Sequence, residues 1–292
     1  MDKVDAVIER LWSGRSPQTE VLGGGITNHN VKVTLDDGSQ YVLRIVGENT
    51  DLLGINRYVE YEASLAAAAV GVGPDVFTFV EPEGYLVTRF IAGSIVPIES
   101  MQEPESIRRV AQALRAVHAG PALATRFDSF RIIEDYRSVA FREGAEVPAA
   151  YATARQFARR IETARGAIPE RPCHNDLLNA NFIDDGSRIR IVDWEYAGMG
   201  DVFFDLANFS INHSFDEDAQ ARLLEAYFGS VRPEHTRALT LMRFMSDFRE
   251  AMWGVVQNAV STLDFDFRAY ADDHFARLER IADEDAFRAA LG

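Results

Sequence analysis

The sequence predicts an α+β protein with two lobes, a small N-terminal lobe built on an antiparallel sheet with a helix and a larger, mainly helical C-terminal lobe. Its 292 residues are about twice the length of a typical single-core domain, which favours two lobes. β-Branched runs separated by turn residues occupy roughly the first 90 positions, and helical periodicity dominates from about Ala92 onward. We therefore expect residues 1–91 and residues 92–292 to form the two lobes.

Strands and two helices alternate along the expected N-terminal lobe. Apolar residues at helical spacing predict an opening helix, and the turn sequence Asp36-Asp37-Gly38-Ser39 joins two β-branched runs into a hairpin. An alanine-rich helix then stops at Gly71, and two further strands follow. The expected helices are residues 1–11 and 56–70, and the expected strands are residues 30–35, 40–46, 76–80 and 85–91.

The C-terminal lobe is expected to be helical, with helices that include residues 106–118 and 151–165. One β-hairpin interrupts these helices, with strands at 180–183 and 188–193 around the turn at 184–187. Polar side chains gather at both ends of this hairpin. Because functional groups commonly lie on loops that rigid elements hold in place, we expect the hairpin to present a site.

Composition and charge exclude several classes of protein. The apolar fraction of 47% is that of a globular chain, and a net charge of −15 would repel a nucleic acid backbone. The single cysteine, Cys173, cannot form an internal disulfide, and the opening segment lacks the basic and apolar regions of a signal peptide. No apolar stretch approaches the roughly 18–20 residues that span a bilayer. We expect a cytoplasmic protein with no nucleic acid partner and no membrane insertion.

Two polar segments flank the second hairpin, HNDLLNANF at 174–182 and IVDWE at 191–195. Phosphoryl transfer needs a carboxylate that orients a hydroxyl and accepts its proton, together with oxygen ligands for Mg²⁺. Asp176 suits the first role, and Asn181 and Asp193 suit the second. The alternative interpretation is that each residue caps a helix or stabilises a turn, but the combined spacing favours phosphoryl transfer.

Three consecutive glycines, Gly23, Gly24 and Gly25, precede the first hairpin. Backbone N–H groups in such a sequence can approach phosphate oxygens with no Cβ in the way, so the segment could be a nucleotide loop. It matches neither a P-loop nor a dinucleotide-binding fingerprint, and a flexible turn is the alternative interpretation.

A basic residue lies in the middle of an apolar strand. Alternation in YVLRIV places Val42, Arg44 and Val46 on one face, so the Arg44 guanidinium needs an anionic partner. The following helix offers Glu60 and Glu62, and a strand base paired with a helix acid is the arrangement that protein kinases use with lysine. The alternative is an edge-strand arginine that extends to solvent.

The segment 241–263 carries two faces at helical spacing. One face is apolar throughout and is expected to lie in the core. The neighbouring face combines Glu250 and Trp253, and an aromatic ring beside carboxylates can hold a quaternary ammonium group. The alternative, from the helix pattern alone, is that Trp253 is a rim residue of the core.

These motifs resemble the choline/ethanolamine kinase family, within the wider group of aminoglycoside phosphotransferase-like and protein-kinase-like folds. The resemblance covers most of the chain. GGGITNHNVKV is similar to the family's phosphate loop, YVLRI to its nucleotide-contacting strand, HNDLLNAN to its catalytic loop and DWEYAG to its metal segment. The resemblance implies a bilobal protein-kinase-like fold with the active site in the cleft between the lobes.

The resemblance also implies a role for each site residue. It makes Asp176 the catalytic base, and it makes Glu60 the first choice and Glu62 the second choice as the partner of Arg44. The complete set of implied residues is Asp176 for catalysis; Gly23, Gly24, Gly25, Thr27, Asn28, Arg44, Glu60 and Glu62 for the nucleotide; Asn181, Asp193 and Glu195 for the metal; and Glu250, Trp253 and Tyr270 for the substrate.

The expected activity is that of an ATP- and Mg²⁺-dependent kinase acting on the hydroxyl of a small cationic alcohol, with choline as first choice and ethanolamine as second. Departures from the family pattern at Asn212 and Glu250 leave another amino alcohol or thiamine open as acceptor. The alternatives are an aminoglycoside phosphotransferase of the same fold, a non-catalytic nucleotide-binding module, and a metallohydrolase that uses His174, Asp176 and Asp193 as metal ligands. Backbone groups of residues 86–91 are expected to hold the adenine.

Overall fold

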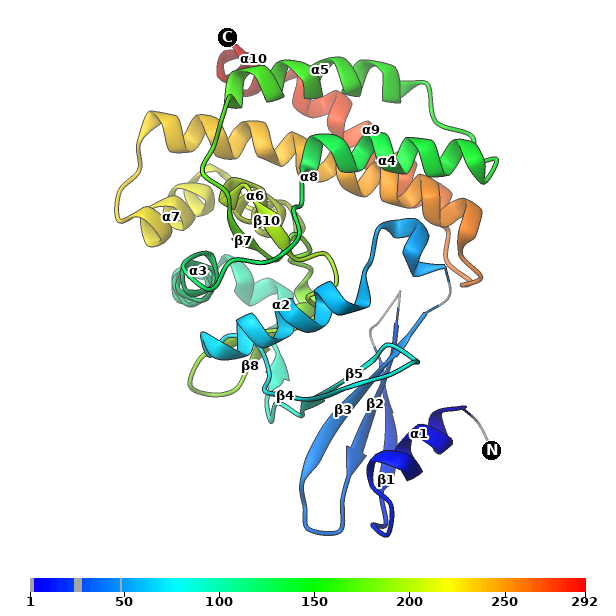
Figure 1. Ribbon diagram of the computed structural model, residues 1–292. Coiled ribbons are helices and arrows are strands. Elements are labelled where there is room, and N and C mark those ends of the chain that lie inside the picture. Colours follow the sequence, from blue (N-terminus) through cyan, green and yellow to red (C-terminus); the bar gives the residue numbers. More distant parts are fainter. Residues whose placement is uncertain (1–2, 24–27, 48) are drawn as a thin grey trace.

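The computed structural model of the chain describes residues 3–23, 28–47 and 49–292 (Figure 1). A small sheet with helix α1 (Lys3–Leu11) lies at one end of the molecule, and a larger helical body lies at the other. The predicted α+β fold with a small sheet lobe and a large helical lobe is confirmed. The predicted division near Ala92 stays a prediction.

The sheet of the small lobe is antiparallel. Its strands lie in the order β1-β2-β3-β5-β4, with bounds β1 (Gln18–Leu22), β2 (Asn28–Thr34), β3 (Gln40–Val46), β4 (Val76–Val80) and β5 (Tyr85–Arg89). The first predicted hairpin is the β2–β3 pair, in which Thr34 lies opposite Gln40. Strand β1 was not predicted, because it is an exposed edge strand without the apolar alternation that marks a strand in sequence.

The two faces of β3 have different roles. Tyr41 and Leu43 point into the core of the small lobe, where they join Val7 and Ile8 of α1. Burial of a side chain such as Leu43 contributes about 1.5–3 kcal/mol to stability. Because successive side chains on a strand alternate between faces, Arg44 lies on the opposite side, toward the interlobe cleft.

Helix α2 (Arg57–Ala69) packs between the two lobes. Its N-terminus is capped by Asn56, whose side chain accepts hydrogen bonds from the backbone N–H groups of Tyr58 and Val59. Two of its alanines, Ala63 and Ala67, belong to the large hydrophobic core of the helical lobe. In Figure 1, α2 accordingly lies between the sheet and the helical body.

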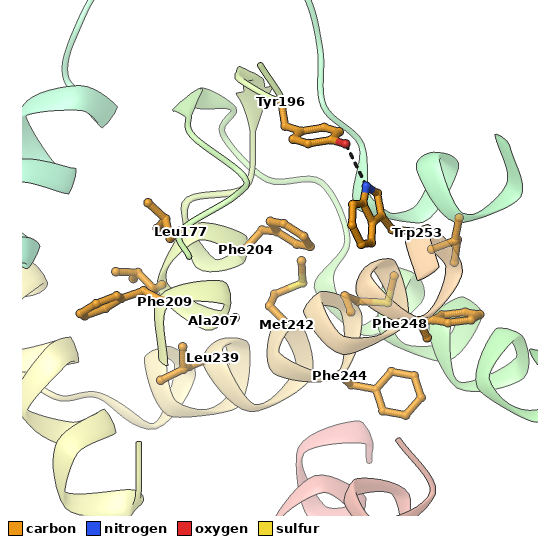
Figure 2. Packing of buried hydrophobic residues seen from close by; sticks show 14 of the residues in the cluster. Leu177, Tyr196, Phe204, Ala207, Phe209, Leu239, Met242, Phe244, Phe248 and Trp253 are labelled. Atoms are coloured by element: carbon orange, nitrogen blue, oxygen red, sulfur yellow. Dashed lines mark hydrogen bonds between the residues drawn. The ribbon is translucent and has the colours of Figure 1, made fainter. Parts of the chain in front are cut away.

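The helical lobe is organised around α8 (Pro233–Val260), whose middle section is buried on nearly all sides. The other helices of this lobe are α3 (Pro104–His118), α4 (Ser129–Arg142), α5 (Ala150–Arg165), α6 (Val202–Asn212), α7 (Glu217–Phe228), α9 (Phe267–Asp283) and α10 (Asp285–Leu291). Helix α8 packs against α4, α6 and α9, and the predicted apolar face that includes Phe244 and Phe248 lies in the core (Figure 2).

Two small sheets hold the polar loops of the helical lobe. The predicted hairpin forms as β8 (Phe182–Asp184) and β9 (Ile189–Ile191), and β6 (Ser94–Ile95) pairs with its outer edge. Strand β7 (Arg171–Cys173) pairs with β10 (Gly198–Gly200). The segments 174–181 and 192–197 therefore run between two fixed hydrogen-bonded pairs, which restrict where their side chains can lie.

The connection between the lobes lies directly on the hairpin. A Cβ at Gly93 would clash with the carbonyl oxygen of Asp184, so only glycine permits this approach. The approach fixes residues 86–95 beside the polar loops.

None of the helices in the described ranges is both long enough and apolar enough to cross a bilayer.

Candidate active site

A cavity of about 300 Å³ lies between the small sheet and the β8–β9 hairpin. This volume is at the lower end of the range found for small-molecule sites, about 300–1,000 Å³. The small lobe, the connection between the lobes and the polar loops all contribute to its wall. Lining residues include Gly23, Val42, Arg44, Glu60, Leu86, Thr88, Arg89, Phe90, Ile91, Gly93, Asn181 and Asp193.

Side chains of α6 hold the loop that carries Asp176. Asp205 accepts hydrogen bonds from the backbone N–H groups of His174 and Asn175, at 2.9 and 2.7 Å. Asn208 Oδ1 accepts the N–H of Leu177 at 2.5 Å. Asn175 adopts a left-handed backbone with φ of 67°, a conformation that costs energy and persists where surrounding bonds enforce it.

Asp176 is the central carboxylate of this loop and is only 7% exposed. Asn181 Nδ2 donates to its backbone oxygen at 2.9 Å, so these two predicted site residues are in direct contact. Burial raises the pKa of Asp176 to about 7, and Glu250 adds to the rise while Arg249 opposes it. A carboxylate with its pKa near neutral can accept a proton from an alcohol during reaction.

Asn181 and Asp193 both line the cavity, as the motif spacing predicted. Asp193 has φ of 70°, a left-handed conformation that asparagine and aspartate tolerate better than most residues. One carboxylate and one amide side chain at a solvent-connected wall provide hard oxygen donors, the ligand type that Mg²⁺ prefers. This donor set fits a magnesium ion that also binds nucleotide phosphates.

Arg44 is surrounded by three carboxylates. Its Nε lies 2.8 Å from Glu60 Oε1, and its Nη2 contacts both Asp193 and Glu195, the latter at 3.0 Å. Glu60 is therefore the helix partner of Arg44. The second choice for this partner, Glu62, is wrong. Its side chain is exposed, because a shift of two residues along a helix turns a side chain to the opposite side of the helix.

Glu195 lies deeper than the predicted metal site. It is 4% exposed, and its Oε2 accepts bonds from Asn28 Nδ2 at 2.8 Å, from Arg44 at 3.0 Å and from Arg57 at 3.2 Å. Three donors on one oxygen make Glu195 an anchor for cationic side chains. Arg57, which also contacts Glu60 at 2.7 Å, was not predicted as part of this network.

The predicted nucleotide loop is described in part. Gly23 lines the cavity, and a Cβ built there would meet no neighbouring atom. Asn28 is buried at the start of β2, where its side chain bonds to Glu195. Gly24, Gly25 and Thr27 lie outside the described residues.

The predicted aromatic residues lie together on α8 and α9. The rings of Trp253 and Tyr270 are 5.7 Å apart in an edge-to-face arrangement. Trp253 is 8% exposed, and its Nε1 donates to the hydroxyl of Tyr196 at 3.0 Å (Figure 2). Tyr196 was missed as a site residue, although it stands in the DWEYAG motif and thus close to Asp193 in sequence.

Glu250, a predicted substrate-binding residue, is paired within the protein. It is buried, its Oε1 accepts a bond from Arg249, and its Oε2 accepts the hydroxyl of Tyr270 at 2.8 Å. A role for Glu250 in binding a cationic substrate stays a prediction.

Arg249 itself is the main site residue that the sequence analysis missed. Its Nη2 donates to Asp176 Oδ1 at 3.1 Å. The signal was present in the sequence: Arg249 follows Met245 by four positions and precedes Met252 by three, which puts a charge on the apolar face of α8. A charge on such a face requires buried partners.

The two lobes, the cavity between them with Asn181 and Asp193 in its wall, and the contact of Asn181 with the backbone of Asp176 fit a kinase-like phosphotransferase. Comparison with known proteins agrees with this class. Residues 18–241 match the phosphotransferase enzyme family (APH). A solved structure, described as a choline/ethanolamine kinase family protein from Mesorhizobium loti, is 32% identical, with a TM-score of 0.85 over 100% of this chain and 98% of that chain.

Curated relatives are similar over most of their length. Protein LicA of Haemophilus influenzae is 29% identical over 252 residues, which are 80% of this chain and 72% of the relative. Ethanolamine kinase 2 of Homo sapiens is 27% identical over 303 residues, which are 92% of this chain and 77% of the relative. The chain belongs to the phosphotransferase enzyme family and, within it, to the choline/ethanolamine kinase family. It is an ATP-dependent small-molecule phosphotransferase, as the motifs predicted.

Proposed function

We propose that the protein transfers the γ-phosphate of ATP to the hydroxyl of choline, or of ethanolamine. The observation that carries this proposal is the placement of Asn181 and Asp193 in the wall of a cavity that borders the small lobe, with Asn181 also bonded to the backbone oxygen of Asp176. The names of the similar proteins, which include a choline/ethanolamine kinase family protein and an ethanolamine kinase, support the choice of acceptor.

The nucleotide half of the proposed site is the cavity wall. Backbone groups of residues 86–91 would hold the adenine, and Arg44 would contact the phosphates together with the glycine segment that contains Gly23. Asn181 and Asp193 would hold Mg²⁺, which supplies positive charge against the phosphate oxygens when it is bound. Glu195 would orient Arg44 rather than bind the metal, because three donors already occupy its Oε2.

Asp176 would act as the general base of the reaction. It would orient the acceptor hydroxyl for in-line attack on the γ-phosphate and accept the hydroxyl proton as the new O–P bond forms. The O–P bond to the bridging oxygen of ADP breaks, and ADP leaves with the electron pair. Buried surroundings and the contact with Asn181 hold the loop at one position relative to the cavity.

The acceptor half of the proposed site is the aromatic set on α8 and α9. Trp253 and Tyr270 would surround the ammonium group, because aromatic faces attract cations by about 0.5–2 kcal/mol each. Glu250 would contribute by holding Arg249 and Tyr270 rather than by direct charge attraction. Because Glu250 is already paired with Arg249, the aromatic rings would provide most of the attraction for the cation. This arrangement favours choline, whose charge is spread over methyl groups, over ethanolamine.

We also propose a cytoplasmic location. The one cysteine of the sequence, Cys173, is buried as a free thiol, which suits a reducing compartment. Fractionation of cells that produce the protein would test this location, and recovery in a secreted fraction would contradict it.

The experiment that tests the function is an assay with Mg·ATP and four acceptors: choline, ethanolamine, thiamine and an aminoglycoside. Mass spectrometry identifies the phosphorylated product, and ADP release gives the rate. We expect phosphocholine or phosphoethanolamine as the main product. Product from the aminoglycoside or thiamine alone would overturn the proposed acceptor, and ATP binding without any product would favour a non-catalytic nucleotide-binding module.

A further inference from the structure

A fully buried guanidinium contacts the loop that carries Asp176. Arg249 is 1% exposed, and its Nη2 donates to Asp176 Oδ1 and to the backbone oxygen of Asn175, both at 3.1 Å. One nitrogen thus bridges a side chain and the backbone of two consecutive loop residues. A buried charge of this kind persists only where its partners compensate for the loss of water.

Groups from two helices and the 192–197 segment fix the position of Arg249. Glu250 on α8 accepts a bond from Nη1, and Tyr270 on α9 donates to the other oxygen of Glu250 at 2.8 Å. The guanidinium carbon lies 4.6 Å from the ring centroid of Tyr196. The guanidinium is planar and rigid, so these contacts together determine the direction of its Nη2–H bonds.

The contact with Arg249 makes the two oxygens of Asp176 unequal. Oδ1 is bonded to Arg249, and Oδ2 receives no hydrogen bond from the residues that the structure describes. A carboxylate held at one oxygen cannot rotate freely about its terminal torsion, which is otherwise broad. Oδ2 is therefore the oxygen left for an acceptor hydroxyl.

We propose that Arg249 is a positioning residue for phosphoryl transfer: it holds Oδ1 of Asp176 so that Oδ2 stays in one place to receive the acceptor hydroxyl. Arg249 acts through Asp176 and does not itself touch the nucleotide cavity, whose lining does not include it among the described residues. The inference rests on the proposed role of Asp176 as general base, and it does not depend on which alcohol is the acceptor.

The first test compares Arg249→Lys with a matched control, Arg243→Lys, on the same helix. Lysine keeps the charge but lacks the planar fork, so it cannot reproduce both the Asp176 and the Glu250 contacts. Arg243 donates to Ser210 Oγ at 2.7 Å, and within the described residues it makes no hydrogen bond to the loop at 174–181. We expect Arg249→Lys to lower kcat at least about tenfold with an ATP KM within about twofold, and Arg243→Lys to change kcat by less than about twofold.

The second test asks whether Arg249 acts through Asp176. A double-mutant cycle compares wild type, Arg249→Lys, Asp176→Asn and the double variant, with kcat measured for each. If Arg249 positions Asp176, the loss caused by Arg249→Lys shrinks to within about twofold in the Asp176→Asn background. A full and additive loss in that background would overturn the proposal, and so would a wild-type kcat in Arg249→Lys.

A third variant, Glu250→Gln, helps to separate a positioning role from a folding defect. It removes the carboxylate that holds Nη1 and leaves a neutral side chain of the same size. Thermal unfolding checks that each variant is folded. We expect Glu250→Gln also to lower kcat, by an amount that shrinks in the Asp176→Asn background. Equal losses of kcat and unfolding temperature across Arg249→Lys, Glu250→Gln and Arg243→Lys would show a merely structural role and overturn the proposal.

Failure of this inference and failure of the proposed function give different results. If the wild-type protein phosphorylates neither choline nor ethanolamine, the proposed acceptor is wrong. The role of Arg249 is then still tested by the same double-mutant cycle. The cycle is then run on whichever acceptor of the panel is phosphorylated, or on ATP hydrolysis with water as the acceptor, read as ADP release.

Discussion

Arg44 on β3 and Glu60 on α2 form an ion pair in which Nε lies 2.8 Å from Oε1, and both side chains are almost completely buried. The pair joins the small sheet to the helix that packs on the large core. Because Arg44 also contacts Asp193 across the cleft, the position of α2 decides where the guanidinium lies relative to the cavity. The ion pair therefore couples the packing of the lobes to the site.

Glu60→Gln should weaken nucleotide binding. The variant removes one of three carboxylates around Arg44 and lets the guanidinium move toward Asp193 and Glu195. We expect the ATP KM to rise about tenfold, equivalent to about 1.4 kcal/mol, with a smaller change in the acceptor KM. Steady-state kinetics with each substrate varied in turn would measure both constants.

Glu62→Gln is the matched control for that variant, since it makes the same change on the same helix at an exposed position. It should leave both KM values and the unfolding temperature close to those of wild type. Equal effects of the two substitutions would show that charge on α2, rather than contact with Arg44, accounts for the result.

Asp176→Asn should abolish most of the turnover while it preserves nucleotide binding. Asparagine can still accept a hydrogen bond from Arg249 but cannot take the hydroxyl proton. We expect kcat to fall at least about 100-fold, the lower range for loss of a general base. Isothermal titration with ATP should give a Kd close to that of wild type. A variant with comparable turnover would refute the assigned role.

Trp253→Ala should affect a cationic acceptor more than a neutral one. Loss of the ring would weaken choline binding by about 1–2 kcal/mol if the ammonium lies on it. The neutral carbon isostere 3,3-dimethylbutan-1-ol separates charge from shape, and Trp253→Phe keeps a ring while it removes the bond to Tyr196. Equal rises in KM for choline and its isostere would argue against a cation site at Trp253.

Local chemistry explains what could be predicted from the sequence. The turn at 36–39 and the turn at 184–187 each specify a tight connection, so the hairpins followed from a few adjacent residues. Asp176 and Asn181 are five positions apart in one loop, and Asp193 returns at the end of the same hairpin. Their proximity in the structure therefore depends on one short supersecondary element.

Long-range packing explains what could not be predicted. Arg249 contacts Asp176 across 73 sequence positions, and this contact depends on how α8 packs in the folded lobe. Adjacent residues on a helix do not ordinarily face each other, yet Arg249 and Glu250 form an ion pair, and both side chains are buried. Sequence spacing carries no direct record of such contacts.

Asp205 provides a prediction about pH and stability. Burial alone would raise the pKa of Asp205, but hydrogen bonds and charge from His118 and the backbone N–H of His174 outweigh burial, so its pKa lies below the usual value. A carboxyl with a lowered folded-state pKa stabilises the fold above its unfolded pKa of about 4, and this stabilisation is lost as pH falls through the folded value.

Asp205→Asn should therefore destabilise the protein strongly at pH 7 and less at pH 3. The carboxylate accepts the N–H groups of His174 and Asn175 and lies 2.9 Å from His118 Nε2. An asparagine has one acceptor oxygen, so we expect a loss of about 1–3 kcal/mol for each buried donor left unpaired. Urea unfolding at both pH values would measure the difference between variant and wild type. A difference that stayed constant from pH 7 to pH 3 would show that the charge on Asp205 does not stabilise the loop.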